Sequence, residues 1–152
     1  MSTHTMTDES IDALNDLIEN AKDGEYGFEE CAKRVQSSAL QGTLRRRAQE
    51  CRNAAIELQS MVTRLGGEPA EGGTALGALH RGWISVKDAL TPDSDRRILD
   101  EAERGEDSAL ARYRKALKAE LTPEVRQLVE RQMAGAKANH DEVKRLRDST
   151  PA

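Results

Sequence analysis

Apolar residues recur at alternating intervals of three and four along four long stretches of this 152-residue chain, and this spacing strongly limits its fold. The alternation returns an apolar side chain to the same face of an α-helix at every turn. It is typical of the seam along which helices pack in a left-handed bundle. The four stretches are residues 7–37, 39–65, 92–119 and 122–148. Each is long enough for the four helices to pack side by side.

Glycine, proline and capping residues mark the expected helix boundaries. Gly66-Gly67-Glu68-Pro69 predicts the end of the second helix. The Thr-Pro pairs at 91–92 and 122–123 predict helix starts, because threonine can cap and proline is tolerated in the first turn. Ser38-Ala39-Leu40-Gln41 has the spacing of a capping box, which predicts a start near residue 39.

The lengths of the connections predict the topology. Almost no linker separates the first helix from the second, or the third from the fourth, so each pair should form an antiparallel hairpin. The hairpins are joined by about 26 residues, enough to cross the bundle end to end, with a short helix expected over 74–90. Two hairpins with one long crossover define a ferritin-like four-helix bundle. We therefore predict one all-α domain over 7–148, preceded by a disordered tail at 1–6.

Composition narrows the classes of function. The net charge is −4, which gives no reason to expect a nucleic-acid partner. No apolar run approaches the roughly 20 residues of a membrane span, and the first ten residues lack a signal-peptide core. Cys31 and Cys51 are too few for a disulfide framework. We expect a cytoplasmic protein with reduced thiols, either a monomer or a homodimer.

Three polar residues, Glu25, Glu106 and His140, interrupt the apolar seams. A buried carboxylate is costly unless it is paired, hydrogen-bonded or bound to a metal. Both glutamates follow a glycine and lie about 15 residues from the turn of their hairpin, and His140 falls within one turn of the height of Glu106. The sequence therefore places three side chains at mid-height that could bind a metal ion or be satisfied by pairing and hydrogen bonds.

The pattern resembles the ferritin-like di-iron proteins, which use a lone Glu on two helices and Glu-x-x-His on the other two. Glu25 and Glu106 match the lone glutamates, and His140 matches one histidine. The residue three before His140 is Lys137, where the motif has Glu, and the helix over 39–65 contains no Glu-x-x-His. The resemblance thus implies a degenerate centre holding one iron or zinc ion. The alternative is that the glutamates are satisfied by hydrogen bonds or by a shared proton, without metal.

The chain more closely resembles an uncharacterised bacterial family, a domain of unknown function (2383) with a ferritin-like bundle. The likeness extends over residues 11–148, and its most specific segments are Gly66–Pro69, Gly73, Gly77–Trp83, Leu14–Ile18, Glu103–Asp107 and Val129–Gln132. This family is distantly similar to bacterial stress-associated ferritin-like proteins. The family resemblance implies the ferritin-like fold and adds no known activity, and the distant similarity suggests a metal-binding protein with a stress-associated role. A non-catalytic structural or protein-interaction module without metal is the alternative.

Two further motifs have ordinary structural interpretations. Arg45-Arg46-Arg47 is a basic run that could contact an anionic partner, but acidic residues nearby favour a solvated helix surface. His80-Arg81-Gly82-Trp83 lies in the expected crossover helix, where Trp83 should pack against the bundle and His80 should form a hydrogen bond at its rim.

Overall fold

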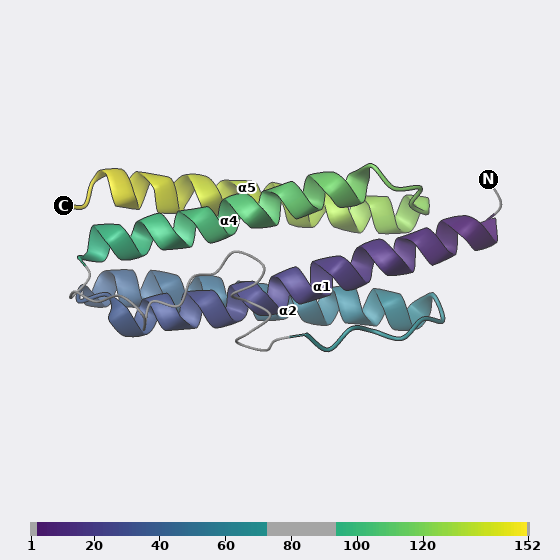
Figure 1. Cartoon of the computed structure of the whole chain (residues 1–152), viewed down its shortest axis with the longest axis horizontal. Coiled ribbons are helices and arrows are strands. Elements are labelled where there is room, and N and C mark those ends of the chain that lie inside the picture. Colours follow the sequence, from purple (N-terminus) through teal and green to yellow (C-terminus); the bar gives the residue numbers. More distant parts are fainter. Residues whose placement is uncertain (1–2, 73–93, 152) are drawn as a thin grey trace.

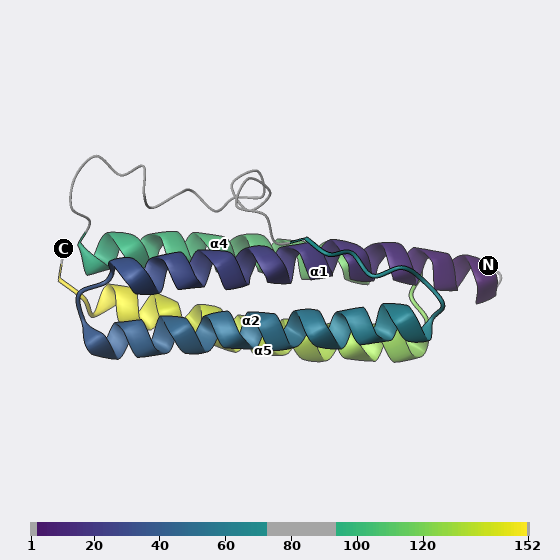
Figure 2. The ribbon, with the colours of Figure 1, turned by 90° about the horizontal axis from the view of Figure 1, so that it is seen from below.

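The computed structural model describes residues 3–72 and 94–151, and within them all regular secondary structure is α-helical. Its four helices are α1 (Thr3–Arg34), α2 (Ser38–Arg64), α4 (Asp95–Leu117) and α5 (Pro123–Asp148). Figure 1 shows α1 beside α2 and α4 beside α5, and the turned view in Figure 2 shows α1 beside α4 and α2 beside α5. The predicted four-helix bundle of two hairpins is confirmed.

Two serines and one threonine cap the N-termini of α2, α4 and α5 with their side chains. Ser37 accepts a hydrogen bond from the backbone N–H of Leu40, and Ser94 and Thr122 make the equivalent bonds at the starts of α4 and α5. The predicted start of α5 at the Thr122-Pro123 pair is confirmed. α2 ends before Gly66, whose φ of 86° lies in the left-handed region that favours glycine. The predicted helix stop is therefore also confirmed.

Two predicted boundaries are wrong. α1 begins at Thr3, so the disordered tail expected over 1–6 is helical from residue 3 onward. α4 begins at Asp95, three residues later than expected, because Ser94 supplies its cap. The short helix expected over 74–90, with His80 and Trp83, lies outside the described residues.

The core divides into two apolar clusters along the bundle. One gathers around Phe28, Leu44, Ile98, Leu99 and Val143, and the other around Leu14, Leu17, Leu58, Val125 and Val129. All ten of these side chains are at most 2% exposed. At mid-height, between the clusters, the bundle interior contains polar residues, among them Arg47 and Glu106.

Hydrogen bonds hold the connections against the helices. Both carboxylate oxygens of Asp95 accept from the α1–α2 turn, from the N–H of Gln36 at 2.7 Å and of Ser37 at 3.1 Å. The beginning of the long crossover returns along α1, where the side chain of Asn15 bonds the backbone of Glu68 and Ala70. Neither described part of the chain, 3–72 or 94–151, contains a helix with the length and apolarity needed to cross a membrane.

Candidate metal site and central cavity

Arg47 of α2 and Glu106 of α4 form an ion pair at the centre of the bundle. The Nε and Nη2 atoms of Arg47 donate to Oε1 of Glu106 at 3.0 and 2.7 Å. Both side chains are about 95% buried, with 5% and 4% of their surface exposed. The guanidinium also lies over the Phe28 ring, 5.1 Å from its centroid, which adds a cation–π contact.

Arg47 faces more negative charge than its single positive charge can neutralise. Its Nη1 atom donates to Oε1 of Glu50 at 2.8 Å, so a single guanidinium serves two carboxylates. The second oxygen of Glu106, Oε2, is buried and has no hydrogen-bond partner within residues 3–72 and 94–151. Burial raises the pKa of Glu106 above its ordinary value, and the charge and hydrogen bonds of Arg47 oppose this rise only in part.

The expectation that the whole run Arg45–Arg47 is solvated is wrong for its last member. Arg45 and Arg46 are exposed, whereas Arg47 is 4% exposed. Arg47 lies three residues after the buried Leu44 and four before Cys51, so it shares their face of the helix. This spacing was present in the sequence as a signal of an inward-pointing arginine.

A cavity of about 470 Å³ adjoins the buried pair at mid-height. We call it the central cavity. It is lined from all four helices, including apolar and small residues such as Phe28, Ala54 and Ala109. Exposed residues of α2 and α5, among them Asn53 and Gly135, also line it. The cavity therefore reaches solvent between α2 and α5, two neighbouring helices that contact each other sparsely.

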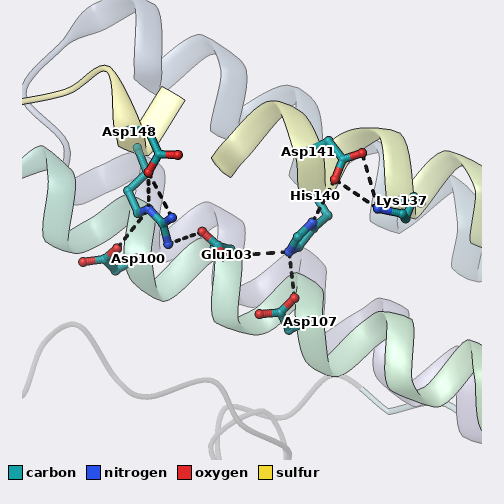
Figure 3. Close-up of polar contacts among 8 residues, drawn as sticks. Asp100, Glu103, Asp107, Lys137, His140, Asp141 and Asp148 are labelled. Atoms are coloured by element: carbon teal, nitrogen blue, oxygen red, sulfur yellow. Dashed lines mark hydrogen bonds and ion pairs between the residues drawn. The ribbon is translucent and has the colours of Figure 1, made fainter. Parts of the chain in front are cut away.

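A second polar site, the His140 cluster, consists of Glu103 and Asp107 on α4 and His140 on α5. Nε2 of His140 lies 2.7 Å from Oδ1 of Asp107 and 3.9 Å from Oε1 of Glu103, as Figure 3 shows. The candidate ligand atoms of all three residues lie within 4.8 Å of one another. The histidine and glutamate side chains are 13% and 14% exposed, and Asp107 closes the cluster from the solvent side.

Neighbouring charges orient the cluster. Nδ1 of His140 lies 3.2 Å from Oδ1 of Asp141, which in turn accepts from Lys137. When Nδ1 carries the ring proton and donates it to this carboxylate, the lone pair of Nε2 is directed at Glu103 and Asp107. Among the described residues, Nε2 is buried without a properly oriented hydrogen bond, although Oδ1 of Asp107 lies 2.7 Å away. Metal-ligating histidines are commonly held in this way, by a carboxylate on the other ring nitrogen.

The three residues predicted as one ligand set do not come together. Among the residues described, the one group able to share a metal ion is the His140 cluster, which contains only one of the three. Glu106 is paired with Arg47, and Glu25 lies half-buried along a surface groove with Glu29 and Arg45.

The packing of α1 explains the position of Glu25. The neighbouring Gly24 faces α2 so closely that a Cβ atom added to it would lie 2.8 Å from Sγ of Cys51. Adjacent residues of a helix are separated by about 100°, so Glu25 is turned to the flank. Sequence reasoning also missed Glu103 and Asp107, although they lie four residues apart on the same helix face.

The chain belongs to a family described as "Domain of unknown function (DUF2383)", whose model matches residues 9–119. This confirms the resemblance seen in the sequence. No curated protein matches the chain.

Solved structures with the same bundle include several ferritin relatives. One is a ferritin-like, diiron-carboxylate protein from Bacillus anthracis, with 19% identity, a TM-score of 0.74, and coverage of 96% of this chain and 99% of that one. Another is a dodecameric thioferritin from Bacteroides fragilis, with 17% identity, a TM-score of 0.74, and coverage of 91% and 83%. A third is Mycobacterium smegmatis Dps, with 14% identity, a TM-score of 0.76, and coverage of 91% and 85%. At these identities the similarity establishes the ferritin-like fold.

Proposed function

We propose that this protein binds one divalent transition-metal ion, iron(II) or zinc(II), at the His140 cluster rather than on the bundle axis. The ligands are Nε2 of His140 and one oxygen each from Glu103 and Asp107. The observation that carries the proposal is the buried Nε2 atom of His140, which lies against two carboxylates and, among the described residues, makes no well-formed hydrogen bond. A cation at this point satisfies all three groups, since imidazole and carboxylate together suit iron and zinc.

The surroundings support a cation at the His140 cluster and disfavour one on the axis. Asp141 holds the histidine ring by its other nitrogen. Arg147 forms an ion pair with the second oxygen of Glu103, leaving Oε1 toward the histidine. On the axis, the Arg47 guanidinium already occupies Oε1 of Glu106, and the remaining oxygen has no second ligand beside it with which to hold a metal ion among the described residues.

Titration of the metal-free chain with zinc(II), and anaerobically with iron(II), tests this proposal by calorimetry. We expect one ion per chain for the wild type. His140→Ala and Asp107→Asn should each weaken binding at least tenfold, because each removes a ligand. Asp141→Asn should weaken it about 10- to 100-fold, through loss of the bond that orients the ring.

Asp100→Asn is the matched control. It removes one carboxylate charge, as Asp107→Asn does, but Asp100 lies one turn before Glu103 and two turns before Asp107 on α4, where it contacts Arg147. It should leave affinity unchanged. Glu25→Gln and Glu106→Gln test the ligand set predicted from the sequence, and they too should have no effect. Absence of stoichiometric binding by the wild type would refute the proposal and favour a structural or interaction module without metal.

We further propose that such a site serves metal handling in a stress-associated role, in a non-catalytic protein. The support is the ferritin-like fold shared with Dps and thioferritin. The expected monomer or homodimer stays a prediction, which sedimentation of the intact chain with and without zinc(II) tests. A dodecamer would contradict it.

A further inference from the structure

The central cavity is a second candidate binding site, which the proposed metal binding does not use. Its volume of about 470 Å³ lies within the range of small-molecule pockets, roughly 300–1,000 Å³. Small residues from all four helices, including Ala21, Ala54, Ala109 and Gly135, keep the space between the helices open. A Cβ atom added to Gly135 would meet nothing within 4 Å.

A specific unsatisfied group lies in the wall of this cavity. Glu106 lines the cavity and is 3% exposed, and its Oε2 atom is buried without a hydrogen-bond partner among the described residues. A buried acceptor left unpaired is costly, so a ligand that brings a donor to this atom would recover much of that cost. Within the described part of the chain, the wall supplies no N–H or O–H group to Oε2.

The charges that line the cavity identify the kind of donor. They comprise three carboxylates and two guanidiniums, so one negative charge remains when all are ionised; these residues are Glu50, Glu57, Glu106, Arg47 and Arg131. An anionic ligand would add to this excess. A metal ion would need several ligand atoms at one point, whereas Oε2 of Glu106 requires only a single donor. A compact organic cation with N–H donors fits both the net charge and this free acceptor.

We propose that the central cavity binds a small, mainly apolar organic amine in its ammonium form, with its N–H donated to Oε2 of Glu106. The apolar body lies against Phe28, Ala54 and Ala109, where burial of its surface supplies most of the affinity. The ligand enters between α2 and α5. This proposal does not depend on the metal site.

The test uses three probes that share one ring system: 1-naphthylmethylamine, 1-naphthylmethanol and 1-naphthoate. Fluorescence titration of the full chain should show one saturable site for the amine, at least tenfold tighter than for the carboxylate. Glu106→Gln should abolish the preference for the amine over the alcohol. Glu25→Gln is the matched control outside the cavity and should preserve that preference.

Gly135→Leu should fill the space and weaken amine binding at least tenfold. Gly42→Leu makes the same change on an exposed face of α2, where an added Cβ also meets nothing within 4 Å, and should leave binding unchanged.

A second measurement uses the wild type alone and so does not depend on the folding of any variant. Nuclear Overhauser contacts should join the naphthyl protons of the bound amine to the methyl groups of Ala54 and Ala109. Absence of those contacts, equal binding of amine and carboxylate, or no saturable binding would overturn the proposal. Saturation with zinc(II) should leave amine affinity unchanged.

Discussion

Replacement of Arg47 by methionine tests the central electrostatic feature of this bundle. The side chain is 5% exposed and its partner Glu106 is 4% exposed, so solvent screens neither charge. Methionine retains much of the apolar volume beside Phe28 but removes both hydrogen bonds to Oε1 of Glu106. Removal of one partner of a buried ion pair leaves the other charge uncompensated, at a cost of about 3–5 kcal/mol.

That loss is measurable by urea denaturation and by thermal melting. At about 2–4 °C per kcal/mol for a chain of this length, the melting temperature should fall by roughly 6–20 °C. The double variant Arg47→Met/Glu106→Leu should recover most of the lost stability, because no buried charge remains. Arg46→Met is the control, since Arg46 is 56% exposed and its ion pairs should contribute under about 1 kcal/mol. A loss under about 1 kcal/mol for Arg47→Met, or no recovery in the double variant, would refute the reasoning.

Three further predictions concern pH, backbone conformation and thiol reactivity. The raised pKa of Glu106 means that the folded state holds the carboxyl proton of Glu106 more tightly than the unfolded state does. The wild type should therefore lose stability relative to Glu106→Gln as the pH rises above about 4.5, the ordinary pKa, and through the raised pKa. Urea midpoints of both proteins measured from pH 4 to 8 test this. Gly66→Ala should lower the free energy of unfolding by about 1–2 kcal/mol, because Gly66 has a positive φ. Gly42→Ala, in an exposed helix interior, should raise it by about 0.5–1 kcal/mol. Equal effects of the two variants in urea denaturation would contradict this account. Burial raises the pKa of both Cys31 and Cys51 to about 12, so Ellman's reagent at pH 8 should label them only after urea unfolding, and rapid native labelling would show that the thiols are accessible as thiolates.

The proposed metal site at the His140 cluster shows why sequence reasoning named one of its three candidate ligands and missed the other two. His140 was conspicuous because a polar ring interrupts an apolar seam. Glu103 and Asp107 interrupt nothing, since charged residues are ordinary on the flank of a helix. They become candidate ligands only because α5 packs against α4 at a height and rotation that bring Nε2 of His140 between them. This relation depends on two helices at once.

The four long helices and their pairing as hairpins followed from the sequence alone, because they depend on local spacing, caps such as Thr122, and connection length. The tertiary structure decided which polar residues meet. Glu25 and Gly24 differ by only about 100° on α1, and the close contact of Gly24 with Cys51 turned the glutamate away from the core. Glu106 found its partner in Arg47, 59 residues earlier in the chain. Apolar periodicity specifies a face to within about one residue, whereas an ion pair or a metal site requires the rotation of two helices to be set together by packing.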